Sequence, residues 1–140
     1  MRNLGLDIGD KRIGVAISDP GEILASPLTT IIRDNDEKAM EAILELVTRH
    51  EVRRIVVGLP YSLDGSVGEQ AKKVAYFVEK LSKQSEVNIV TWDERLSTVA
   101  AERLMIGSGK KKADRKSQRD AAAAAFILQG YLDSLESSAQ

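Results

Sequence analysis

The feature that most constrains the fold is a short, almost uninterrupted apolar run near the middle of the chain, Arg54-Ile55-Val56-Val57-Gly58-Leu59-Pro60. Such a run is expected for a strand whose two faces are both buried, as in a parallel sheet covered by helices. Amphipathic segments with apolar residues at helical spacing lie on either side of it, at about 36–50 and from about 66 onward, where Ser66 and Glu69 form a capping-box pattern. The centre of the chain therefore predicts an α/β fold.

Three further strands are predicted before this region, at residues 3–9, 13–18 and about 24–32, and one after it at 88–92. The first two are joined by a short turn, which indicates a hairpin. Helices are predicted at about 97–107 and 118–135. This order predicts one domain over residues 1–140, with a mixed five-stranded sheet of three antiparallel and then two parallel strands, flanked by helices on both faces.

The composition restricts the chemistry that the chain can perform. The 140 residues include no cysteine and a single histidine, His50, at the end of a predicted helix. Disulfides, thiolate zinc sites and cysteine nucleophiles are excluded, and Ser-His-Asp catalysis is disfavoured. What remains is carboxylates, hydroxyls, Lys and Arg, which favour oxygen-ligated cations such as Mg²⁺ or Mn²⁺. With no membrane-length apolar stretch and no signal-peptide pattern, we expect a cytoplasmic protein that does not bind membranes.

Asp7 is the first candidate site residue because it lies inside the opening strand. Leu4, Leu6 and Ile8 alternate with Gly5, Asp7 and Gly9. An ionised carboxylate in an apolar strand is costly unless a cation or several donors compensate it, and flanking glycines leave room for a ligand. The alternative is a carboxylate facing solvent.

Two further acidic positions complete a candidate metal site. Asp93 and Glu94 directly follow the strand ending at Trp92, at the sheet edge where α/β proteins meet ligands. Either one could face inward, depending on where that strand ends. Asp120 shares a helical face with apolar residues, although Ser117 and Asp120 also fit a capping pattern. Three converging carboxylates would repel one another unless a divalent cation neutralised them.

Basic residues cluster near the same features. Lys11, Arg12 and Arg95 are predicted close to this sheet edge, where they could hold phosphates. The net charge of the chain is only −1, but the segment 110–120 carries six basic residues against two acidic ones. The candidate nucleic-acid contacts in it are Lys110, Lys111, Lys112, Arg115 and Lys116. A mobile, solvated loop over residues 107–116 is the alternative.

Four segments together resemble the YqgF family of bacterial RNase H-like proteins: 7–16 (DIGDKRIGVA), 58–65 (GLPYSLDG), 93–98 (DERLST) and 120–128 (DAAAAAFIL). Members of this family have been described as Holliday junction resolvases and as nucleases of pre-16S ribosomal RNA. The resemblance implies an RNase H-like fold and a metal-dependent nuclease site formed by Asp7, Glu94 with Asp93 beside it, and Asp120.

The expected function is thus hydrolysis of phosphodiester bonds with two Mg²⁺ or Mn²⁺ ions. Precursor ribosomal RNA is the preferred substrate and a branched DNA junction the second. We expect a monomer, because no dimerisation element is evident in the sequence, or a weak homodimer. A dimer would be needed for junction cleavage, which requires two symmetric cuts. The D-x-G hairpin also fits actin-like kinases, which however need two such domains. A non-catalytic nucleic-acid-binding factor is the third alternative.

Overall fold

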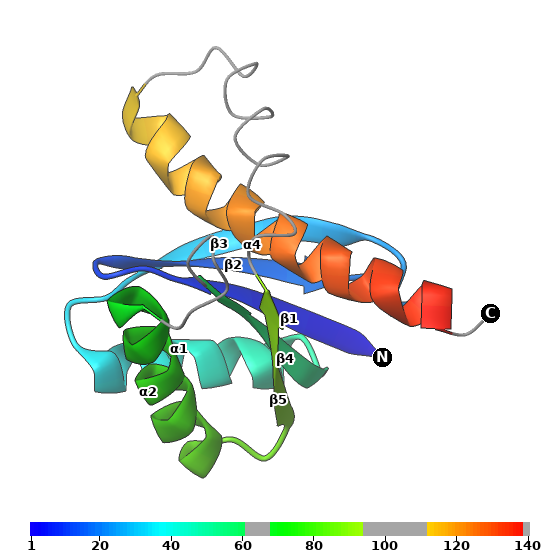
Figure 1. The fold of residues 1–140 in the computed structure, drawn as a ribbon, viewed down its shortest axis with the longest axis horizontal. Coiled ribbons are helices and arrows are strands. Elements are labelled where there is room, and N and C mark those ends of the chain that lie inside the picture. The colour runs from blue at the N-terminus through cyan, green and yellow to red at the C-terminus, as the bar shows by residue number, and fades with distance from the viewer. Residues whose placement is uncertain (61–67, 94–111, 139–140) are drawn as a thin grey trace.

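The computed structural model describes residues 1–60, 68–93 and 112–138, and it contains a five-stranded sheet (Figure 1). The strands are β1 (Arg2–Ile8), β2 (Arg12–Ser18), β3 (Ala25–Ile32), β4 (Val52–Leu59) and β5 (Asn88–Asp93). Their order in the sheet is β3-β2-β1-β4-β5. The β1–β2 and β2–β3 pairs are antiparallel, and the β1–β4 and β4–β5 pairs are parallel. The predicted sheet, with three antiparallel strands and then two parallel ones, is confirmed.

Helices cover both faces of the sheet (Figure 1). The face with α1 (Asp36–Arg49) and α2 (Glu69–Gln84) carries the main core, in which Leu4, Leu6 and Ile8 are buried. The other face lies under α4 (Lys112–Ser138). Burial of each such aliphatic side chain stabilises the folded state by about 1.5–3 kcal/mol relative to leaving it exposed to water. The strict alternation in β1 explains why Leu4, Leu6 and Ile8 face one layer while Gly5 and Asp7 face the other.

A smaller core lies between the sheet and α4. Ala16 and Val56 from the sheet pack there with Ala124, Ile127 and Leu128 of the helix. Small residues on the sheet let the helix approach closely, and the helix presents its apolar stripe at the expected spacing. The predicted inward face of the last helix is therefore present.

The ends of the helices differ from the predictions. The sequence favours Asp36 as the cap of α1, but the N-cap residue is Asn35, whose side chain accepts a hydrogen bond from the Lys38 backbone N–H at 3.2 Å. Helix α2 begins after Gly68 and has no side-chain cap, so the predicted Ser66 capping box is wrong. The predicted helix at 97–107 lies outside the described residues.

Helix α4 begins at Lys112, six residues earlier than predicted. Lysine, alanine and arginine favour helical backbone, so the helix extends through the basic segment rather than starting at Ser117. Residues 112–116 are accordingly helical, which corrects the prediction of a loop there. Ser117 and Asp120 lie inside the helix, and the alternative in which they cap its start is wrong. None of the helices in the described ranges is long and apolar enough to cross a membrane.

Candidate active site

Asp7 lies on the face of the sheet that α4 covers, and the adjacent positions of the described strands on that face are glycines. Gly5 precedes it by two residues, and Gly9 follows just beyond β1. Gly14 of β2 is paired directly with Asp7. On the other side the register pairs Leu6 with Val57, so that Gly58 of β4 lies next to Asp7. The half-buried Asp7 side chain thus lies among glycines of the described strands, whose lack of side chains lets a cation or a phosphate approach this part of the sheet.

Asp120 is brought to this place by the close approach of α4 to β2. A Cβ atom added to Gly14 would lie 1.8 Å from the Asp120 carbonyl oxygen and 2.3 Å from its carbonyl carbon. The backbone of Asp120 therefore rests on the residue that pairs with Asp7. Two carboxylates that are 113 positions apart in the sequence share one corner of the sheet.

The Asp120 carboxylate forms an ion pair with Arg12, the first residue of β2. The distance from Arg12 Nε to Asp120 Oδ2 is 2.7 Å, and the two side chains are 38% and 23% exposed. Arg12 was predicted to contact nucleic acid. In this structure it holds one oxygen of Asp120, while Lys11 next to it is exposed at the hairpin.

The residues at the end of β5 divide between the two faces of the sheet. Trp92 pairs with Gly58 and packs in the α4 core, on the same face as Asp7. Asp93 pairs with Leu59, which packs against the opposite core. Strand alternation therefore assigns Asp93 to the α1–α2 face. Glu94 and Arg95 lie outside the described residues, as do Lys110 and Lys111, and the side chains of Lys112, Arg115 and Lys116 are not described.

Trp92 contributes a buried donor on the same face of the sheet as Asp7. Its ring packs edge-to-face with that of Tyr131, with 6.0 Å between centroids and an interplanar angle of 84°. Its indole Nε1 is buried and has no acceptor among the residues that the structure describes. A buried N–H group of this kind is costly and is usually satisfied by an acceptor.

Arg33 fixes the hairpin that carries the site, a role that the sequence did not reveal. Its guanidinium donates to the Gly9 carbonyl oxygen at 2.9 Å and to Asp36 at 2.8 Å, and it stacks 4.9 Å from the Phe77 ring centroid. Its backbone N–H donates to the Lys11 carbonyl oxygen at 2.9 Å. The hydrogen bond from Arg33 holds the pKa of the Asp36 carboxyl below its ordinary value, with burial acting in the opposite direction. No local pattern identifies such a residue, because its partners come from three separate segments: the β1–β2 hairpin, the start of α1 and α2.

The donor set fits a hard divalent cation, although the described residues alone do not complete a site. Carboxylate oxygens are the ligands that Mg²⁺ and Mn²⁺ prefer, and the glycine floor around Asp7 gives a cation access. Among residues 1–60, 68–93 and the described part of α4, no three acidic or histidine side chains are close enough together to hold a metal. The third predicted ligand, Glu94, lies outside these ranges.

Comparison with known proteins identifies the family. A family model described as "RuvX: Holliday junction resolvase" matches residues 1–134. The chain belongs to the RuvX family. It is 49% identical over 134 residues to a protein of Desulforamulus reducens named "Putative pre-16S rRNA nuclease", covering 96% of this chain and 98% of that protein. A protein of the same name from Caldanaerobacter subterraneus subsp. tengcongensis is 48% identical, over 99% and 100% of the two chains. The predicted YqgF resemblance is thereby confirmed.

Solved structures agree on the fold of this RuvX chain. Thermus thermophilus RuvC in complex with a Holliday junction substrate superimposes with a TM-score of 0.62 at 15% identity, over 97% of this chain and 96% of that one. The Fowlpox virus resolvase in complex with Holliday junction DNA gives 0.59 at 13% identity, over 96% and 99%. At such low identity the likeness concerns the fold, and the predicted RNase H-like architecture is confirmed.

Proposed function

We propose that this RuvX protein is a metal-dependent nuclease that hydrolyses phosphodiester bonds in nucleic acid, in the cytoplasm. The observation that carries the proposal is the contact of the Asp120 backbone with Gly14, the residue paired with Asp7. It brings two acidic side chains to one glycine-lined corner of an RNase H-like sheet. Membership of a family described by its resolvase activity supports the same reading.

In this proposal Asp7, Asp120 and Glu94 are the catalytic carboxylates and hold Mg²⁺ or Mn²⁺. Bound divalent cations would supply Lewis-acid assistance to the attacking water and to the leaving oxygen. Strand alternation favours Glu94 over Asp93 as the third ligand, because residue 94 would return to the face of Trp92 and Asp7 if the pleat continued. Asp93 would then be a metal ligand only if it reached the cation from the α1–α2 face of the sheet.

Arg12 acts on Asp120 in this site. Its 2.7 Å contact fixes one carboxylate oxygen of Asp120, and the proposal assigns the other oxygen to the cation. Lys11, exposed on the same hairpin, and Arg95 are proposed to contact substrate phosphates. Lys110, Lys111, Lys112, Arg115 and Lys116 are proposed to contact the backbone more widely.

Processing at the 5′ end of pre-16S rRNA is the preferred reaction. The relatives at 48–49% identity over nearly their full length carry names that refer to this RNA. Resolution of Holliday junctions is the second candidate, because the family description names it. Junction cleavage requires two active sites related by symmetry, whereas RNA processing does not. A monomer or weak homodimer is consistent with the first reaction.

The test is cleavage by purified protein of labelled precursor rRNA and of a synthetic four-way junction, with Mg²⁺, with Mn²⁺ and with EDTA. We expect divalent-cation-dependent cleavage of the RNA at its 5′ extension. Sedimentation at the assay concentration separates a monomeric nuclease from a dimeric resolvase. Binding of both substrates without cleavage under any condition would favour the non-catalytic factor.

Asp7→Asn is the decisive variant and Glu86→Gln its matched control. Both remove one carboxylate charge, but Glu86 is exposed just before β5, at the end of the sheet away from Asp7. We expect Asp7→Asn to lose cleavage and Glu86→Gln to retain it. Cleavage by pure Asp7→Asn protein at the wild-type rate would contradict the site assignment.

A further inference from the structure

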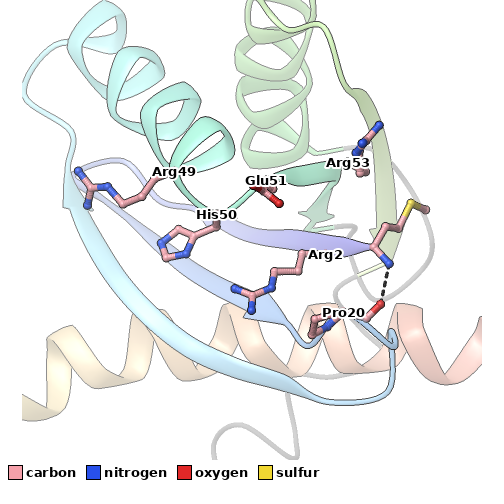
Figure 2. A pocket seen from close by; sticks show the side chains of 7 residues that line it. Arg2, Pro20, Arg49, His50, Glu51 and Arg53 are labelled. Carbon is pink, nitrogen blue, oxygen red and sulfur yellow. Dashed lines mark hydrogen bonds between the residues drawn. The ribbon is translucent and has the colours of Figure 1, made fainter.

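A second site-like feature is a basic pocket at the opposite end of the sheet from Asp7. It has a volume of about 620 Å³, within the range of about 300–1,000 Å³ found for ligand pockets. Three arginines and the only histidine of the chain line it: Arg2, Arg49, His50 and Arg53 (Figure 2). They come from the start of β1, the end of α1 and the start of β4, so the pocket is assembled by the fold.

The charge inside this basic pocket is strongly positive. The ammonium group of Met1 is also at the pocket, where it donates to the Pro20 carbonyl oxygen at 2.6 Å. Among the described residues that line the pocket, Glu51 is the only acidic one. Arg49 forms an ion pair with Glu45 on the surface of α1, and its side chain is 61% exposed. With that pair counted as neutral and the Met1 ammonium left out, Arg2 and Arg53 still exceed Glu51 by one charge among the described lining residues.

A purely structural explanation accounts for only half of these residues. Arg49 and His50 lie at the C-terminal end of α1, where cations compensate the negative end of the helix dipole. That reason does not apply to Arg2 or Arg53, which belong to β1 and β4. Arg2 of β1 and Arg53 of β4 thus line one pocket, and among the described lining residues only Glu51 opposes their two positive charges. Such a hollow suits an anionic ligand.

The placement of the cations indicates which kind of anion fits. Figure 2 shows Arg49 and Arg53 at opposite sides of the pocket, with His50, Arg2 and the acidic Glu51 between them. Guanidinium groups spread along a hollow match several phosphates in a row, whereas a single phosphate would need donors that converge on one point. We propose that the basic pocket binds the phosphate backbone of a nucleic-acid strand, remote from the catalytic corner.

This inference rests on the proposed nuclease function, because the same strand would extend from the catalytic corner to the pocket. Arg2 and Asp7 are five residues apart on β1, a direct separation of roughly 17 Å, and strand alternation places them on opposite faces of the sheet. A strand that reaches both must pass around the sheet, so at 3.4 Å per stacked nucleotide it spans more than about five nucleotides. The basic pocket therefore binds only substrates whose strand continues well beyond the cleaved bond. A dinucleotide is too short to reach from the catalytic corner to the pocket.

His50 provides a specific probe of occupancy, since the chain has no other histidine. Its imidazole proton resonances are followed by NMR, in EDTA, during titration with a single-stranded RNA of about twenty nucleotides, with a dinucleotide and with inorganic pyrophosphate. We expect the long RNA to shift these resonances and the dinucleotide to leave them unchanged. A shift with pyrophosphate but not with the long RNA would overturn the backbone assignment in favour of a small phosphorylated ligand.

Affinity measurements test the arginines themselves. In the double variant Arg49→Gln with Arg53→Gln, both exposed residues are neutralised, and Lys72→Gln with Lys73→Gln on the exposed side of α2 removes the same charge elsewhere. Each lost phosphate contact on a single strand lowers the log–log salt slope by about 0.7 and the affinity by about 5-fold at 0.1 M salt. The double variant should bind the long RNA about 25-fold more weakly. Glu51→Gln should bind it more tightly.

The outcomes separate the two proposals. If the wild type binds the long RNA while His50 stays unshifted, or if the arginine and lysine variants lose equal affinity, the pocket assignment fails and the nuclease proposal stands. If the wild type binds neither RNA nor a four-way junction, the nuclease proposal fails and the backbone assignment fails with it. Arg53→Gln alone, which leaves the Arg49–Glu45 pair in place, provides a milder variant with about a 5-fold expected loss.

Discussion

Replacing Gly14 by alanine tests whether α4 and the site are built as described. The added Cβ would lie 1.8 Å from the Asp120 carbonyl oxygen, whereas ordinary contacts begin near 3.4 Å, so α4 must withdraw by about 1.6 Å. The clashing atoms belong to the backbone and cannot move without the helix. Overpacking of a tight core costs about 1–3 kcal/mol, and a backbone clash belongs at the upper end. Alanine also lowers the conformational entropy of the unfolded chain, which stabilises the fold by about 0.4–1 kcal/mol. The expected net loss in the free energy of unfolding is therefore about 2–3 kcal/mol.

The assay is urea unfolding followed by far-UV circular dichroism and by the fluorescence of Trp92, the only tryptophan, which packs on Tyr131 of α4. Gly21→Ala is the control, because the nearest atom to its added Cβ is the Asp19 side-chain oxygen at 3.1 Å in an exposed turn. It should change stability by less than about 0.5 kcal/mol. Gly5→Ala, which meets Leu128 Cβ at 2.8 Å, should fall between the two.

The same substitution should reduce cleavage, since displacement of a catalytic group by 1 Å can cost about 10²-fold in rate. If Gly14→Ala protein were as stable as Gly21→Ala protein, the close approach of α4 to β2 would not exist. The placement of Asp120 beside Asp7 would then lose its basis.

Three further results are expected. Asp7→Asn should leave the free energy of unfolding unchanged or slightly raised in metal-free urea titrations, because a crowded carboxylate charge is removed. Arg33→Gln should destabilise the hairpin at pH 7, and part of that loss should vanish in urea titrations below about pH 3.8, the ordinary pKa of Asp36. The depressed pKa of Asp36 stabilises the fold above that value and loses this effect as the pH falls through the folded pKa. Neutralising Lys110, Lys111 and Lys112 should lower the log–log salt slope of nucleic-acid binding by up to about three units, with a smaller effect on turnover at saturating substrate.

The sequence was sufficient to predict the elements whose periodicity is strong. Alternation in 4–9 placed Asp7 on the face opposite Leu4 and Leu6, and helical spacing placed Asp120 on the inward side of α4. The sheet topology followed from the order of strands and helices. In each case a single local pattern agreed with the burial that the fold requires.

Contacts between distant segments could not be predicted in the same way. The Arg12–Asp120 ion pair joins residues 108 positions apart, whereas the sequence predicts Arg12 as a phosphate contact or as a charge at the hairpin tip. The start of α4 was misplaced because the Ser117 pattern is a valid capping signal that the helix-forming residues before it overrode. The face of Asp93 became clear only with its pairing to Leu59, since one residue of uncertainty at a strand end reverses the side chain.

The glycines of this fold connect its stability to its proposed chemistry. Glycine inside a strand is unfavourable by roughly 0.5–1 kcal/mol relative to alanine, so Gly5 and Gly14 weaken β1 and β2 taken alone. They recover this cost because α4 packs on them, with Leu128 and Ala124 over Gly5 and Asp120 over Gly14. The contact between Gly14 and the Asp120 backbone therefore both docks α4 on the sheet and places the Asp120 carboxylate. It follows that substitutions at Gly14 should reduce stability and cleavage together, whereas Asp7→Asn should abolish cleavage in a protein that remains fully folded.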